Sequence, residues 1–308
     1  MSRFTKLVLG ISASETSFQR RGFRGGENGA RERFERIGSA FAAGYHAVLL
    51  NDRPDQFVPE LKRVEAEFRG FAFEGAAMGL ALLDRLTPWR RDRIERFLSG
   101  EGRPYSYLVH VGVGWAMARF PGSIEPGLRR MDPILGWLAL DGYGFHEGYF
   151  HWPKCLADQP IPRRVKGYGK RVFDQGLGRS LWFVEGANVA RLKDTLEKFS
   201  EVRRADLWSG IGLASVYAGE LNETDLGALV GASGRFHPQL AQGAAFAAKA
   251  RMHGGNPTAY TECACRSLCG MSAQEAANLT DAALDDLPAH SSTPAYELWR
   301  VRVQDRFC

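Results

Sequence analysis

Short motifs recur at long intervals in this chain, and this feature constrains the fold more than any other. Residues 111–116 (VGVGWA) are echoed 98 positions later by residues 209–214 (SGIGLA). Residues 44–46 (GYH) are echoed 100 positions later by residues 144–146 (GFH), and residues 73–76 (FEGA) 111 positions later by residues 184–187 (VEGA). Because the echoes keep their order along the chain, the sequence predicts a degenerate internal duplication.

Apolar residues recur at intervals of three and four along most of the chain, as they do in amphipathic helices. One such stripe consists of Phe34, Ile37, Phe41, Tyr45 and Val48. Runs that alternate with a period of two, as a half-buried strand would, are rare. We therefore predict a mainly α protein built from stacked helical hairpins in two related units, and the segment 242–248 allows a partial third unit.

Composition divides the chain into a lead-in and a body. Residues 1–35 are basic and rich in glycine and arginine, so we expect an irregular segment that packs on the body through Phe18 and Phe23. Residues 36–308 are expected to form a single helical domain, with repeat-like units at about 36–130, 131–220 and 221–308.

Several helix boundaries are marked by caps and prolines. The pattern predicts a helix over residues 105–119 that ends just before Pro121. Ser272 and Glu275 have the spacing of a capping box, which predicts a helix start there. Thr87 and Pro88 indicate another start, with threonine as the cap and proline at the first helical position.

Glycines inside helical patterns need an explanation, because each costs about 1 kcal/mol relative to alanine. The pairs Gly112/Gly114 and Gly210/Gly212 therefore predict sites where helix backbones approach closely. A dinucleotide-binding loop is excluded, because the first pair has no third glycine and lies within a helical pattern instead of following a strand.

Bulk properties exclude several function classes. The net charge is only +5 and the basic pairs are scattered, so we expect no nucleic acid partner. No run reaches the roughly 18–20 apolar residues of a membrane-spanning helix. The five cysteines lack the C-x-x-C spacing of zinc sites, which favours buried thiols in a reducing cytoplasm. We therefore expect a cytoplasmic protein.

The densest group of polar and aromatic residues lies at positions 141–152 and contains His146, Glu147 and His151. The two histidines are five positions apart, which does not match the four-residue spacing of a zincin motif. Glu147 and His151, four positions apart, share one helix face. Such residues suit an acid–base pair or two ligands of a metal site, and they also suit a polar pair on a helix surface. We take His146, Glu147 and His151 as the catalytic candidates, with no metal or cofactor assigned.

A second set of residues is predicted to bind the substrate. His46 stands at the position echoed by His146, so the two imidazoles either tie helices together or line one cavity. Glu74 and Glu185 interrupt apolar stretches and are expected to be buried. A buried carboxylate needs a partner, with Arg179 as one possibility, or it faces a pocket. Five substrate-binding candidates follow: His46, Tyr143, Tyr149, Glu74 and Glu185.

Several long motifs resemble those of one known family. They are residues 44–46 (GYH), 73–78 (FEGAAM), 110–116 (HVGVGWA), 140–151 (LDGYGFHEGYFH), 173–187 (FDQGLGRSLWFVEGA), 204–214 (RADLWSGIGLA) and 294–300 (PAYELWR). Together they resemble the UnbL-like proteins of bacterial enediyne biosynthetic gene clusters, over nearly the whole chain.

This resemblance implies a role in converting a linear polyene, a hydrophobic polyketide intermediate, into the enediyne core. It also implies two protein partners of the same pathway, an integral-membrane protein and a large repeat protein, through which the chain would lie at the membrane surface. Two hypotheses follow. The chain is either an enzyme component that acts on the polyene, or a non-catalytic helical-repeat protein that shields the polyene or docks pathway enzymes.

Overall fold

A computed structural model describes residues 9–308 except 27–28, 88, 220 and 289–290. The described residues contain helices and connecting segments and no strand, which confirms the mainly α prediction. The principal helices are α3 (Ala30–Leu50), α5 (Ala66–Leu86), α7 (Ser106–Arg119), α9 (Leu138–Phe150), α11 (Gly169–Val184), α13 (Glu201–Tyr217), α15 (His237–His253) and α17 (Ala273–Ala282).

The remaining helices precede, connect or follow the principal ones. They are α2 (Phe18–Arg21), α4 (Pro54–Arg63), α6 (Arg93–Ser99), α8 (Glu125–Leu128), α10 (Trp152–Ala157), α12 (Val189–Glu197), α14 (Glu223–Ser233), α16 (Ala259–Cys269) and α18 (Ala295–Gln304). The 3₁₀ helices are η1 (Ala13–Thr16), η2 (Arg103–Tyr105), η3 (Leu135–Trp137), η4 (Gly234–Phe236) and η5 (Asp305–Phe307).

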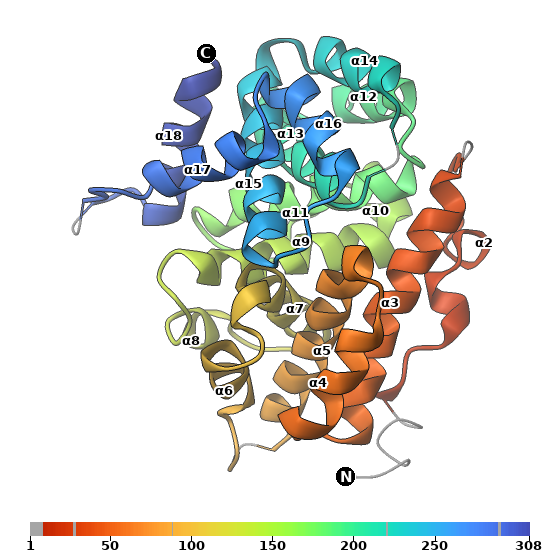
Figure 1. Cartoon of the computed structure of the whole chain (residues 1–308), viewed down its shortest axis with the longest axis vertical. Coiled ribbons are helices and arrows are strands. Elements are labelled where there is room, and N and C mark those ends of the chain that lie inside the picture. The colour runs from red at the N-terminus through yellow and green to blue at the C-terminus, as the bar shows by residue number, and fades with distance from the viewer. Residues whose placement is uncertain (1–8, 27–28, 88, 220, 289–290) are drawn as a thin grey trace.

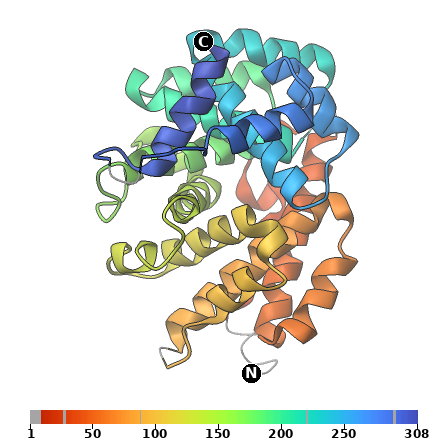
Figure 2. The same ribbon diagram turned by 60° about the vertical axis from the view of Figure 1, so that its left-hand side comes forward.

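The principal helices form a sequential stack. Each one from α3 to α17 packs chiefly against the principal helix before it and the one after it. Figure 1 shows the stack rising along the long axis of the molecule, from α4 and α5 at one end to α14 and α18 at the other. The same order is seen after a 60° rotation (Figure 2). One hydrophobic core runs through the whole stack.

Glycines mark the points where successive helices cross. A Cβ atom at Gly114 would lie 2.0 Å from the carbonyl oxygen of Ala139, and one at Gly178 would lie 2.1 Å from that of Leu207. The predicted close approach is therefore confirmed. Crossing glycines stand at positions 112, 142, 176 and 210, at intervals of 30, 34 and 34 residues. Gly112 and Gly210, which the echo relates, both stand at such crossings, but the helix contacts do not show the predicted duplication into two related units.

The residue before the crossing glycine is polar in five of the principal helices, and these side chains are buried: Glu74, Asp141, Gln175, Ser209 and Gln242. Because the helices are stacked in order, equivalent positions become neighbours. Gln175 Nε2 donates to Asp141 Oδ2 over 2.8 Å, and Ser209 Oγ donates to Gln242 Oε1 over 2.9 Å. We call these five residues the polar seam. It ends, toward the N-terminus, at Glu74.

The lead-in is more regular than the sequence predicted. It contains η1 and α2, and the helical body begins at Ala30 instead of residue 36. The predicted packing through Phe18 and Phe23 is found, because Phe18 stacks on Phe34 and Phe23 meets Tyr149 edge-on at 5.0 Å. The backbone N–H of Arg24 donates to the Val184 carbonyl over 2.7 Å. We call residues 9–26 the N-terminal strap.

Three of the predicted helix boundaries can be checked. The helix expected over 105–119 is α7, and the Ser272–Glu275 capping box is formed. The predicted start at Thr87 is wrong, because Thr87 ends α5 by donating its hydroxyl to the Leu83 carbonyl over 2.7 Å. Pro88 lies outside the described residues, and α6 begins at Arg93.

None of the described helices has both the length and the apolar character needed to cross a bilayer.

Candidate functional site

A narrow apolar cavity opens between the strap and five principal helices. Its lining comes from Ile11, Glu15, Thr16, Phe34, Ile37, Gly38, Phe41, Ala42, Phe71, Glu74, Trp115, Phe145, Tyr149, Phe150, Arg179 and Phe183. About 550 Å³ lies between these side chains and at the mouth, but only about 40 Å³ has room for the centre of a water molecule. The cavity is therefore narrow, and we call it the slot.

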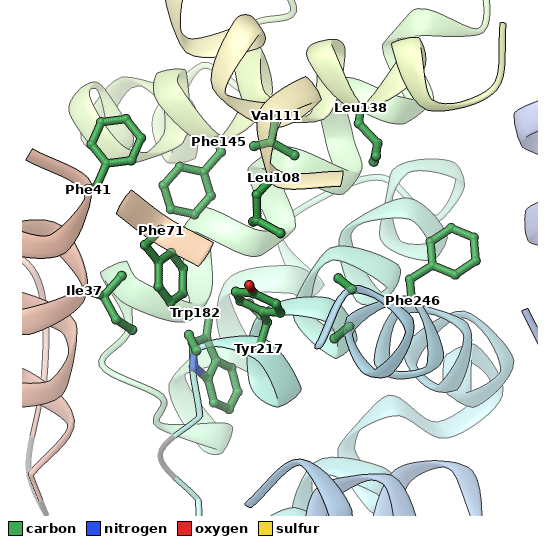
Figure 3. Close-up of a cluster of buried hydrophobic side chains, with 14 of the residues drawn as sticks. Ile37, Phe41, Phe71, Leu108, Val111, Leu138, Phe145, Trp182, Tyr217 and Phe246 are labelled. Atoms are coloured by element: carbon green, nitrogen blue, oxygen red, sulfur yellow. The ribbon is translucent and has the colours of Figure 1, made fainter. Parts of the chain in front are cut away.

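Aromatic rings form most of the wall, and they come from different helices. Phe41 lies 4.4 Å from Trp115, and Phe145 lies 5.2 Å from Trp115, between ring centroids. Figure 3 shows Phe41, Phe71 and Phe145 within one cluster of buried hydrophobic side chains. Such walls offer large apolar contact area and ring faces on which a conjugated ligand can stack.

Glu74, on α5, places a carboxyl group in this apolar lining. Its side chain is buried, and Trp115 Nε1 donates a hydrogen bond of 2.9 Å to Glu74 Oε1. Burial raises the pKa of Glu74 to about 7, although the positive charge of Arg179 and the bond from Trp115 oppose the rise. A carboxyl group with this pKa can give or take a proton near neutral pH, as general acid–base chemistry requires.

Arg179, on α11, is the second charged group in the buried part of the cavity. Its guanidinium forms an ion pair with the fully buried carboxylate of Asp141, and it lies over the ring of Phe145 at 4.9 Å from the centroid. The pair with Asp141 fixes Arg179 in place, while its charge still acts on Glu74. Glu74, at the N-terminal end of the polar seam, and the guanidinium of Arg179 therefore both line the cavity.

The three predicted catalytic residues are brought together by the structure. Glu147 Oε1 lies 3.2 Å from His146 Nδ1, and Glu147 Oε2 lies 3.3 Å from His151 Nδ1. Glu147 can reach both imidazoles because α9 ends at Phe150 and His151 leaves the helical path at φ −125°. One donor atom from each residue lies within 4.8 Å of the others, so the three could hold a metal ion.

The pKa values of the residues in and beside this cluster are shifted in different directions. Burial lowers the pKa of His146, although Glu147 opposes the shift. Burial opposes ionisation of Glu147, but the two imidazoles outweigh it and lower the pKa of that carboxyl. Cys155 is close, donating to the Glu147 carbonyl over 3.5 Å, but burial raises the pKa of its thiol to about 12. That thiol is unsuited to act as a nucleophile.

The histidine cluster adjoins the cavity without lining it. The His146 ring lies 5.7 Å from Trp115 and 4.8 Å from Phe150, and both of those rings belong to the cavity wall. The two features are therefore separated by one layer of aromatic rings. A ligand in the cavity as described would touch Trp115 and Phe150, not His146.

The substrate-binding candidates have different positions. Glu74 and Tyr149 line the cavity. His46 instead accepts a hydrogen bond of 3.1 Å from the Ile11 backbone, and Tyr143 accepts one of 2.8 Å from Arg164. Glu185 is buried and bonded to Arg24 and to Thr195, at 2.8 Å from the latter. Each of these three residues uses a polar atom in a contact that holds the strap or a neighbouring segment. Glu185 Oε2 is buried and has no hydrogen-bond partner.

Two important residues, Trp115 and Asp141, were not identified as part of the site from the sequence. Arg179 was predicted only as a possible partner of a buried carboxylate, and its ion pair is with Asp141. One sequence pattern could have pointed to Asp141. It is a four-residue motif that begins with a polar residue and a glycine and has glycine or alanine at its fourth position, and it recurs at 74–77, 141–144, 175–178, 209–212 and 242–245. Aligning these segments would have placed Glu74 and Asp141 at equivalent positions of stacked helices.

A family model described as a protein of unknown function (DUF1702) matches residues 1–307. No curated protein and no solved structure gives a significant match. Function must therefore be inferred from the cavity and its polar groups.

Proposed function

The chain belongs to the DUF1702 family, whose function is unknown, and we propose that it binds an extended, flat, apolar molecule in the aromatic cavity. One observation carries the proposal: a carboxyl group with a pKa of about 7 lies in a narrow slot walled by rings. The rings supply apolar contact along a conjugated chain. Glu74 supplies a proton donor or acceptor beside it.

We further propose that the natural ligand is the linear polyene of enediyne biosynthesis. The resemblance of residues 140–151 and 173–187 to the UnbL-like proteins supports this choice. The mostly apolar lining of the slot supports it as well, because a conjugated hydrocarbon chain has no polar groups to satisfy. The integral-membrane and repeat-protein partners, and the cytoplasmic location at a membrane surface, belong to the same proposal.

The role of Glu74 differs between the two hypotheses, an enzyme component and a non-catalytic shielding protein. In an enzyme component, the carboxyl takes up or releases a proton as the polyene is rearranged, so its loss stops the pathway while leaving binding intact. In a shielding protein, the carboxyl has no such task, and pathway output follows binding alone. A buried titratable group in a mostly apolar lining favours the enzyme component, because a buried carboxyl costs stability without adding apolar contact.

Binding can be tested with diphenylhexatriene, a flat conjugated hydrocarbon that fluoresces when shielded from water. Ala42 lines the cavity, so Ala42→Phe should fill it and weaken binding at least about tenfold, which corresponds to about 1.4 kcal/mol. The matched control is Ala282→Phe, at an exposed alanine on α17 that does not line the cavity. We expect one binding site per chain, with the control unchanged. No binding, or equal binding by both variants, would contradict the proposal.

Catalysis can be tested with Glu74→Gln in a producing strain. We expect the variant to bind the probe like the parent protein while a pathway intermediate accumulates. Normal product formation would rule out the acid–base role and leave the shielding role.

A further inference from the structure

We propose that His146, Glu147 and His151 form a binding site for one divalent transition-metal ion. The site is separate from the aromatic cavity, and the inference does not depend on what that cavity binds. It rests on the spacing of the donor atoms, on their chemical type and on the different exposure of the two histidines.

The spacing fits a metal ion. Nitrogen and oxygen ligands lie about 2.0–2.2 Å from a zinc-sized ion, so neighbouring donors around it are about 3.0–3.4 Å apart. The two nitrogen–oxygen separations are 3.2 Å and 3.3 Å. All three donor atoms lie within 4.8 Å of one another, so small side-chain rotations would centre them on one ion.

The donor set selects the class of ion. Two imidazoles and one carboxylate suit zinc, iron, cobalt or nickel, whereas magnesium and calcium prefer oxygen ligands throughout. Three protein ligands also leave at least one coordination position open, as in catalytic sites. A purely structural zinc site would be expected to have four protein ligands.

The local fold holds the donors in place and leaves a route for the ion. His146 is packed between Trp115 and Phe150, and its side chain is only 8% exposed. His151 is 55% exposed, so an ion can enter from solvent on that side. The backbone N–H of His151 donates to the Glu147 carbonyl over 2.8 Å, which keeps the two side chains on one side of the helix end.

The proposed metal site lies next to the aromatic cavity. The ion would lie behind Trp115 and Phe150, one aromatic layer from the cavity. Trp115 contacts both features, because its indole N–H donates to Glu74 and its ring lies 5.7 Å from that of His146.

The test uses the untagged full-length protein, freed of metal with a chelator and titrated with Co²⁺ under anaerobic conditions. The visible absorption of Co²⁺ reports ligand type and coordination number. We expect one equivalent to bind, to be displaced by Zn²⁺, and to be unaffected by excess Mg²⁺. His151→Ala and Glu147→Gln should each lower the Co²⁺ affinity at least about tenfold, since even loss of an outer-shell partner costs that much.

His253→Ala is the matched control, because His253 is an exposed histidine at the end of another helix. It should bind Co²⁺ like the parent protein. His151→Ala is preferred to a change at His146, since replacing an exposed side chain preserves the fold, which circular dichroism would verify. Absence of stoichiometric Co²⁺ binding by the parent protein, or equal affinities of H151A and H253A, would overturn the proposal.

Discussion

Trp115 Nε1 donates a hydrogen bond to Glu74 Oε1 over 2.9 Å, and both side chains line the same apolar cavity. An indole N–H can donate to a carboxyl oxygen whether or not the group is ionised. The contact therefore holds the carboxyl in position through both protonation states. Such fixed orientation is what a proton-transfer group needs.

The first prediction concerns the pH dependence of folding. The pKa of Glu74 rises from 4.5 unfolded to about 7 folded. Its favourable contribution is therefore complete below the unfolded pKa and is lost as the pH rises through about 7. The shift corresponds to about 3 kcal/mol. Between about pH 4 and about pH 8, Glu74→Gln should gain that much stability relative to the parent protein in urea denaturation.

Glu60→Gln serves as the control for that experiment, because Glu60 is an exposed glutamate on α4. If the stability of E74Q follows the parent protein in parallel across the pH range, then Glu74 does not titrate as described.

The second prediction concerns the buried ion pair. Removing Arg179 leaves the carboxylate of Asp141 buried without its cation, and such losses cost about 3–5 kcal/mol. Arg179→Met should therefore lower the free energy of unfolding by that amount. It should also raise the pKa of Glu74 further, because the charge of Arg179 opposes the present rise. Arg31→Met, at an exposed pair with Glu35, should change stability little.

The third prediction concerns the helix crossings. A Cβ atom at Gly178 would lie 2.1 Å from the Leu207 carbonyl oxygen, so Gly178→Ala should destabilise the fold by about 3 kcal/mol or more. Gly227 has no atom near the equivalent position, so Gly227→Ala on α14 should stabilise by about 0.5–1 kcal/mol. Chemical denaturation of both variants measures the contrast. A mild effect at Gly178 would mean that α11 and α13 do not cross there.

The fourth prediction concerns the N-terminal strap, which contributes Ile11, Glu15 and Thr16 to the cavity lining. Phe23 anchors the strap on Tyr149. Phe23→Ala should let the strap open more often and speed the association of diphenylhexatriene several-fold in stopped-flow measurements. Phe236→Ala, at a partly buried ring outside the cavity, should leave the rate unchanged. Identical rates would show that entry does not pass the strap.

Much of the fold could be predicted from the sequence, because helices depend on local spacing. A helix was predicted from the apolar stripe that runs from Phe34 to Val48. Close helix crossings were predicted from the glycine pairs at 112/114 and 210/212. The spacing of the crossings was harder to see. Echoes about 100 residues apart are conspicuous by eye, whereas the crossing glycines at 112, 142, 176 and 210 are single residues, and the one at 112 follows Val111 where the others follow a polar residue.

The candidate site was only partly predictable, for a different reason. Glu147 and His151 are neighbours along one helix end, so their contact follows from spacing. The environment of Glu74 depends on Trp115 and Arg179, which come from other helices. Nothing in the sequence indicates that the Tyr143 hydroxyl accepts a hydrogen bond from Arg164. Tertiary contacts decide which polar residues remain available to a ligand.

The central claim is that Glu74 is a cavity carboxyl that titrates near neutral pH, and infrared spectroscopy tests it most directly. The band of a protonated carboxyl should disappear with a midpoint at about pH 7 in the parent protein and should be missing in E74Q. Bound diphenylhexatriene, by excluding water, should move the midpoint higher. A midpoint near the ordinary value of 4.5, unmoved by the probe, would contradict the account.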